Sequence, residues 1–289
     1  MSKGEIVMLG MWQAIWMAIV QGLTEFLPIS SSGHLILMSQ ILGINTDGGP
    51  LLEVLLHVGT LVAVFIVYWQ DVWSLIKEGV LLIIDGVKYL INKKNNPFKM
   101  YTERKMVVMV LIASVPTAIM GLFVEAFLQD IFMSSTIGVG VTLLVTCALL
   151  LASQKIPVGH KTVEKATFRD ALAVGIVQGI ATIPGISRSG STTVAGMAGG
   201  FEKAFAIKFS FLISIPAIAG ATLLTMLKTD YAELAGNWAP YVVGVVVSAA
   251  VGYACIRTLL QLLKNNKFHY FGYYCGVVGV IALVGGLIL

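Results

Sequence analysis

Long apolar runs separated by short polar stretches recur along the whole chain. Six of them reach the roughly 20 residues that a helix needs to cross the hydrocarbon core of a membrane. They predict spanning helices at residues 51–69, 105–128, 132–153, 204–228, 239–263 and 270–289. The pattern therefore predicts an all-α polytopic membrane protein.

Two further apolar stretches, residues 11–43 and 168–200, are interrupted by polar residues at their centres. Each apolar arm is too short to span. Polar backbone at membrane depth is stable only when it is buried in protein or lines a wet cavity. We interpret both stretches as re-entrant helix hairpins.

Residues 72–91 are long enough to span but carry several charges. Asp71, Glu78 and Asp85 recur every seven residues, with Lys88 close to the same helical face. This pattern favours an amphipathic helix on the membrane surface. A spanning helix is the alternative, and the sequence leaves it open.

The two interrupted stretches are related by an offset of 157 residues. Gln21-Gly22 matches Gln178-Gly179, and Ser32-Gly33 matches Ser189-Gly190. We interpret the match as a duplication, with a first repeat at 1–153 and a second at 168–289. Each repeat has one hairpin and three spans, and the two form a single integrated membrane domain.

Lysine and arginine set the expected orientation. They gather at 88–105, at 155–169 and at Lys264 and Lys267, which places these three linkers in the cytoplasm. With 72–91 on the surface, the hairpins enter from opposite sides, the repeats have inverted topology, and the polar tips meet near the midplane. If 72–91 crosses, the hairpins enter from the same side and the argument weakens.

Composition excludes other classes of protein. Hydrophobic residues make up 57% of the chain and charged residues 12%, with a mean hydropathy of +0.88. Charge this sparse cannot cover a soluble protein, and it excludes a nucleic-acid binder. Each of the three cysteines lies alone in an apolar stretch, which favours small buried residues over a zinc or redox site.

The two hairpin tips hold the candidate chemistry, because ionisable groups at membrane depth usually serve function. Arg188 and the helix N-termini suit phosphate oxygens, and a Mg²⁺ ion could join Glu25 to a phosphate. Ser31 and His34 are three residues apart and could form a reacting pair. The tips also contain Gln21, Ser30, Ser32, Gly33, Gln178, Ser187, Ser189, Gly190, Ser191 and Thr192.

These residues support a site for phosphoryl transfer or hydrolysis on a lipid phosphate. Close helix packing is the bland alternative for a stretch rich in serine and glycine. Glu53 and His57, four residues apart in the span 51–69, are interpreted as a structural pair, although a functional role for Glu53 stays open.

The stretches 21–34 and 184–192 resemble the bacterial undecaprenyl pyrophosphate phosphatases of the bacitracin-resistance type. The first is similar to the family's (E/Q)xxxE motif followed by SS-x-GH, and the second to its PGxSRSxxT motif. The resemblance covers essentially the whole chain. It implies two inverted repeats with six spans and two re-entrant helix pairs.

The resemblance also implies an activity. The enzyme would remove the terminal phosphate of undecaprenyl pyrophosphate and so recycle the lipid carrier for peptidoglycan, which confers bacitracin resistance. It would need Mg²⁺ or Ca²⁺ and act at the outer side of the bacterial plasma membrane. The expected partners are the polyprenyl pyrophosphate substrate and membrane lipids, with a homodimer left open.

Residue roles follow from the same resemblance. Glu25 would act at the metal, Arg188 would hold the pyrophosphate, and Ser31 and His34 would supply nucleophile and acid/base, with an activated water also open. Gln21 stands where many members have Glu, which puts it in doubt as a metal ligand. The expected substrate-binding residues are Gln21, Ser30, Ser32, Gly33, Ser187, Ser189, Gly190 and Thr192.

Two other classes compete with the phosphatase. A flippase or transporter of a polyprenyl phosphate carrier would share the inverted repeats and midplane tips. It would use Arg188 to bind a head group but would not need Ser31 and His34 as a reacting pair. A membrane scaffold without activity would leave the charged groups at the tips unexplained.

Overall fold

The chain is described by a computed structural model over residues 9–44, 51–93, 100–128, 135–228, 237–263 and 268–288. Parts of the linkers that set the expected orientation, among them Lys94, Lys99, Lys264 and Lys267, lie outside the described residues, as do 132–134 of one predicted span.

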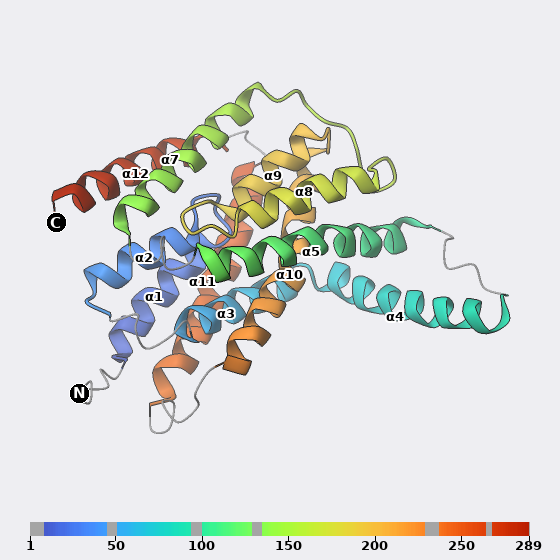
Figure 1. Cartoon of the computed structure of the whole chain (residues 1–289), viewed down its shortest axis with the longest axis horizontal. Helices are drawn as coiled ribbons and strands as arrows, with labels where there is room; N and C mark the ends of the chain where they lie inside the picture. The colour runs from blue at the N-terminus through green and yellow to red at the C-terminus, as the bar shows by residue number, and fades with distance from the viewer. Residues whose placement is uncertain are drawn as a thin grey trace.

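The described residues form an all-helical protein apart from one isolated β-bridge between Lys161 and Phe201 (Figure 1). The helices of the first half are α1 (Met11–Thr24), α2 (Ser31–Ile41), α3 (Leu51–Val67), α4 (Trp69–Asn92), α5 (Thr102–Phe127) and α7 (Thr136–Ala152), followed by the short η2 (Ser153–Lys155). Those of the second half are α8 (Phe168–Ile180), α9 (Arg188–Ala198), α10 (Lys203–Lys228), α11 (Ala239–Leu263) and α12 (Tyr270–Ile288).

Five of the described helices, α5, α7, α10, α11 and α12, are long and apolar enough to cross a membrane. Helices α3 and α4 pass the same test only as a pair, bent by 93° at Tyr68. The prediction of an all-α polytopic membrane protein is therefore confirmed. How the two halves are oriented relative to a membrane stays a prediction.

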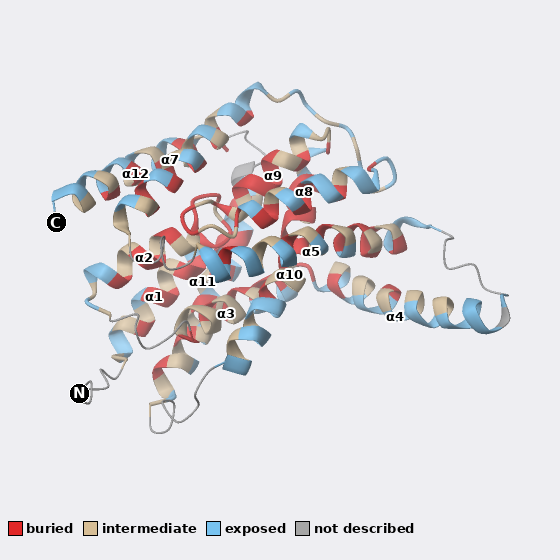
Figure 2. Ribbon diagram, in the orientation of Figure 1, coloured by how far each residue is buried: buried red, intermediate tan, exposed pale blue. Residues whose placement is uncertain are grey.

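Helix α4 turns its charged face toward the protein. Asp85 accepts a hydrogen bond of 2.7 Å from Arg104 of α5, and Asp71 accepts one of 2.8 Å from Lys208 of α10. Its apolar side chains point outward instead, among them Ile83 and Leu90, which are 68% and 82% exposed (Figure 2). The helix is amphipathic as predicted, and whether it lies on the membrane surface or within the membrane stays open.

The two hairpins, α1–α2 and α8–α9, meet at their tips through reciprocal contacts. Gly33 lies against Gly185, with only 3.1 Å for an added Cβ, and Gly190 lies equally close to Pro28. The offset of 157 residues exchanges these two contacts. Reciprocal contacts of this kind are what two copies related by a two-fold axis must make.

Glycine permits the second tip to turn where it does. Gly185 has a φ of +87°, a left-handed conformation that costs an L side chain free energy. A Cβ there would also fall 1.8 Å from Thr142 Oγ1. The tip therefore packs on α7 only because no side chain intervenes.

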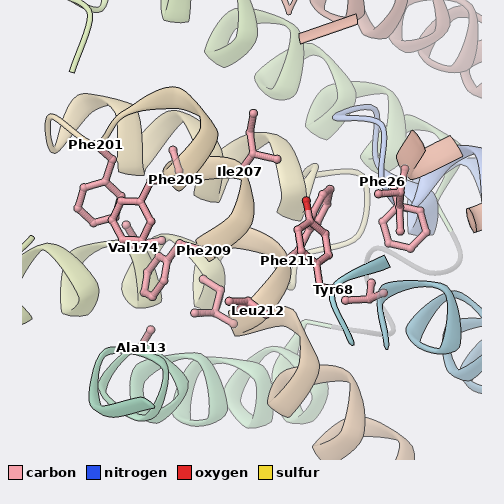
Figure 3. Packing of buried hydrophobic residues seen from close by; sticks show 14 of the residues in the cluster. Phe26, Tyr68, Ala113, Val174, Phe201, Phe205, Ile207, Phe209, Phe211 and Leu212 are labelled. Atoms are coloured by element: carbon pink, nitrogen blue, oxygen red, sulfur yellow. The ribbon is translucent and has the colours of Figure 1, made fainter. Parts of the chain in front are cut away.

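Aromatic packing joins the halves beneath the tips. Phe26, directly after α1, meets Phe211 of α10 edge to face at 5.6 Å between ring centroids, and Tyr68 packs beside the same ring at 5.9 Å (Figure 3). Phe201, Phe205 and Phe209 continue the cluster. In a membrane such close packing, rather than exclusion from water, holds helices together.

Candidate active site

A cavity of about 480 Å³ opens beside the meeting tips. The hairpins supply its polar end, and helices α3, α5 and α10 line the rest. Apolar residues such as Leu122 and Ile218 form much of its wall. The cavity thus joins a charged end to a largely apolar one.

Glu25 is the centre of the charged end. It follows α1 directly and is 7% exposed. Its Oε2 accepts hydrogen bonds from Ser31 Oγ at 2.6 Å and from Gln21 Nε2 at 3.0 Å. Its Oε1 accepts one from the Arg188 guanidinium. A buried carboxylate needs such partners, because unpaired charge at this depth is costly.

Helix starts at both tips bring hydroxyl groups to the same cavity. Ser30 caps α2 by accepting from Gly33 N at 3.3 Å, and Ser187 caps α9 by accepting from Gly190 N at 3.1 Å. Each cap serine also lies close to the serine two residues on, at 3.4 Å and 3.5 Å between the hydroxyl oxygens. Helix N-termini favour anions. The two helix starts and their serine hydroxyls, together with Arg188, therefore form a polar surface suited to an anionic group. The residues of the tips that line the cavity include Glu25, Ser30, Ser31, Ser32, Ser187, Arg188 and Ser189.

Glu53 and His57 of α3 also line the cavity. His57 Nε2 lies 3.4 Å from Glu25 Oε2, and its Nδ1 donates to the Glu53 carbonyl at 2.8 Å. With Nδ1 committed, Nε2 can carry a proton toward Glu25 only in the imidazolium form. The expected structural pair therefore faces the site. The sequence indicated this pair, because it places two ionisable groups one helical turn apart at membrane depth.

His34 does not reach Ser31 in this structure and is not among the residues that line the cavity. Its Nδ1 is 2.7 Å from the Ser30 carbonyl oxygen, and its Nε2 is 2.9 Å from the Tyr274 hydroxyl of α12. The predicted Ser31–His34 pair is thus not brought together, and Glu25 occupies the place beside the Ser31 hydroxyl.

Other predicted residues support the tips from behind. Gln21 and Thr192 are fully buried; Gln21 donates to Glu25, and Thr192 Oγ1 bonds the Arg188 carbonyl at 2.8 Å. Gly33 and Gly190 provide the close contact between the hairpins. These four residues shape the site without lining the cavity.

The polar side chains of the site suit a metal ion that takes some of its ligands from a bound phosphate. Within the described residues, no three His, Cys, Asp or Glu side chains lie close enough together to bind a metal. Mg²⁺, however, commonly uses one or two carboxylates and takes its other ligands from phosphate and water. Glu25 offers the carboxylate. Gln21 Oε1 lacks a hydrogen-bond partner but does not line the cavity.

Comparison with known proteins gives consistent relatives. The family model of the bacitracin resistance protein BacA matches residues 14–281. The undecaprenyl-diphosphatase of Alkaliphilus metalliredigens is 42% identical over 280 residues, covering 96% of this chain and 99% of the relative. The undecaprenyl-diphosphatase of Methanosphaera stadtmanae is 39% identical over 282 residues, covering 98% of this chain and 100% of the relative. The chain therefore belongs to the BacA bacitracin resistance protein family.

Proposed function

We propose that this protein hydrolyses undecaprenyl pyrophosphate to undecaprenyl phosphate and inorganic phosphate, and so recycles the lipid carrier for peptidoglycan and confers bacitracin resistance. The observation that carries the proposal is the contact of the buried Glu25 with Ser31 and Arg188 at the end of a largely apolar cavity. The name undecaprenyl-diphosphatase of the relatives supports it.

The pyrophosphate would bind at the tips, with the prenyl chain along the apolar part of the cavity. Arg188 offers a forked guanidinium that binds phosphate oxygens in pairs. A phosphate there would compete with Glu25 for Arg188, and the carboxylate would lose its strongest partner. Substrate binding would thereby free Glu25 to accept a proton.

Ser31 is the nucleophile that this geometry favours. Its hydroxyl already donates to Glu25 Oε2 at 2.6 Å, which is the relation of a nucleophile to its base. Attack by Ser31 Oγ on the terminal phosphorus would form a phosphoserine and break the bond to the bridging oxygen, releasing undecaprenyl phosphate. Water would then attack the phosphoserine, releasing inorganic phosphate and restoring the serine.

Arg188 and the backbone N–H groups of the two tips would stabilise the charge that spreads over the equatorial oxygens. Glu25 would hold a divalent cation, Mg²⁺ or Ca²⁺, and such an ion would supply further neutralisation of phosphate charge. His57 would stay beside Glu25 as a polar neighbour while Arg188 is engaged with substrate.

The cavity would face the outer side of the plasma membrane. It extends along the C-terminal halves of α5 and α10 as far as Glu125 and Thr225. The opposite end of α5 carries Arg104 and Lys105, which belong to a linker that the positive-inside rule places in the cytoplasm. An outward cavity would meet the pyrophosphate where cell-wall assembly leaves it.

Phosphate release from farnesyl or undecaprenyl pyrophosphate in detergent, with Mg²⁺, Ca²⁺ or EDTA, tests the proposal. We expect metal-dependent release by the wild type and losses of at least about 10²-fold in Glu25→Gln, Ser31→Ala and Arg188→Lys, a typical scale for one catalytic group. Ser39→Ala is the matched control, since Ser39 is a buried serine on α2 whose hydroxyl donates to the Ile36 carbonyl of its own helix.

A folded wild type that releases no phosphate with any metal would contradict the hydrolase. Binding of the lipid without release would then favour the alternative, a flippase of a polyprenyl phosphate carrier, which transfer between vesicle leaflets would measure. A Ser31→Ala variant with full activity would instead keep the hydrolase and make water the nucleophile.

A further inference from the structure

The first hairpin tip is held in a conformation that the second tip does not adopt. Ser30 has a φ of +70° and a ψ of 98°, whereas its counterpart Ser187 has the ordinary values of −71° and 111°. A left-handed φ at a residue other than glycine is uncommon and persists only where the surroundings enforce it. The two tips also differ two residues earlier, where Pro28 stands opposite Gly185, so the left-handed residue is Ser30 in the first tip and Gly185 in the second. Because Ser30 is not a glycine, contacts must hold it in this conformation.

His34 provides the contact that is specific to the first tip. Its backbone N–H donates to the Ser30 carbonyl at 3.3 Å, and its ring Nδ1 reaches the same oxygen at 2.7 Å. The offset of 157 places Ser191 where His34 would be in the second tip, and there only the helical bond from Ser191 N to Ser187 O, 2.9 Å long, remains. The strained serine and the imidazole thus occur together in one tip and are both missing from the other.

Tyr274 of α12 holds the imidazole from the far side. Its hydroxyl lies 2.9 Å from His34 Nε2, and the two rings stack with 5.6 Å between centroids and 9° between planes. A carbonyl oxygen can only accept, so Nδ1 carries the proton of the neutral ring and Nε2 accepts from the tyrosine. Both ring nitrogens are therefore engaged, and neither faces Ser31.

We propose that Tyr274 is a positioning residue for Ser31, acting through His34, which fixes the Ser30 carbonyl and with it the direction of the next residue. This role rests on the proposed function for its effect on rate. If the pair were released, Ser30 could leave the left-handed conformation that these contacts hold. The Ser31 hydroxyl would then lose its alignment with Glu25.

Substitutions of His34 separate positioning from proton transfer. In His34→Asn the carboxamide nitrogen can replace Nδ1 as donor to Ser30, but the side chain cannot act as acid or base. We expect His34→Ala to lower kcat by about 10²-fold and His34→Asn to recover at least about ten-fold of that loss, with KM little changed. Equal loss in the two variants, with both folded, would make His34 an acid/base and overturn the proposal.

Substitutions of the tyrosine test the second contact. Tyr274→Phe keeps the ring and removes the hydroxyl, and we expect kcat to fall by about five- to ten-fold with an unchanged KM. Tyr273→Phe is the control, because that neighbouring tyrosine is 55% exposed and belongs to the same helix. A Tyr274→Phe variant that matches Tyr273→Phe in kcat would contradict a positioning role.

A spectroscopic measurement decides the pairing without any activity. In protein labelled with ¹⁵N-histidine, the chain has four imidazoles, and the His34 signal is the one that vanishes in His34→Asn. We expect the Nδ1–H tautomer and a shifted Nε2 resonance in Tyr274→Phe. An Nε2–H tautomer, or a resonance indifferent to Tyr274, overturns the pairing. If the wild type released no phosphate, the proposed function would fail while this result still stood.

Discussion

His57 Nε2 lies 3.4 Å from Glu25 Oε2, and so an imidazole from α3 faces the central carboxylate of the site. Its other nitrogen is committed to the Glu53 carbonyl. The partner of Glu25 from outside the hairpins is therefore a residue of α3, which neither hairpin motif contains.

Replacement of His57 tests whether this neighbour matters. We expect His57→Ala to lower phosphate release by about 10- to 10²-fold, because Glu25 loses the polar neighbour that lies 3.4 Å from its carboxylate. The exposed His160 provides the control, and His160→Ala should match the wild type. Equal rates for the two variants would mean that His57 takes no part in the reaction.

The apolar part of the cavity offers a steric test. An added Cβ at Gly220 on α10 meets nothing within 4 Å, and the residue lines the cavity. Gly220→Leu should therefore fold, narrow the cavity and raise KM for the undecaprenyl substrate by about ten-fold, a loss of roughly 1.4 kcal/mol in binding. Gly285→Leu on α12 has the same free space away from the cavity, and we expect its KM to stay at the wild-type value.

The aromatic contact beneath Glu25 makes a prediction about stability. Phe26→Ala removes the buried ring that packs against Phe211, and truncations of this kind cost about 3–5 kcal/mol. We expect a clear fall in the thermal unfolding temperature in detergent, together with reduced activity. Phe127→Ala, at a ring that is 67% exposed, should unfold within about a degree of the wild type.

The start of α8 gives a pH dependence. Burial alone would raise the pKa of Asp170, but hydrogen bonds from the Thr167 backbone and hydroxyl and the nearby Lys161 lower it overall. A lowered folded pKa means that Asp170 stabilises the fold above the unfolded pKa of about 3.9 and loses this contribution as the pH falls through the folded value.

We therefore expect Asp170→Asn to be less stable than the wild type at neutral pH and the difference to shrink on acidification below about pH 4. Unfolding temperatures measured from pH 7 to pH 3 would show it. A gap that stays constant over this range would mean that Asp170 acts without its charge.

The sequence predicts some of these features because their cause is local. Spans and interrupted hairpins follow from runs of apolar residues and from the polar residues that break them. No residue pattern predicted the 93° turn between α3 and α4, because the turn lies at Tyr68 and neither proline nor glycine is next to it.

The site was predictable only in part, because some of its contacts join residues that are far apart in the chain. Glu25, Ser31 and Arg188 were expected together, and the structure places them in one cluster. The direction of His34 was not, because it depends on Tyr274, which lies 240 residues away in the chain. Spacing within a motif limits which side chains can meet, but distant neighbours decide which of them do.

The reciprocal contact of the two tips also bears on how the two repeats can change by mutation. Ser31 and Arg188 occupy the same position of the repeat, so a pair of identical chains could offer two hydroxyls or two guanidiniums there, never one of each. The proposed reaction uses both. When one gene encodes both copies, the equivalent position can hold a serine in one repeat and an arginine in the other. Mutation can then change each of the two residues independently.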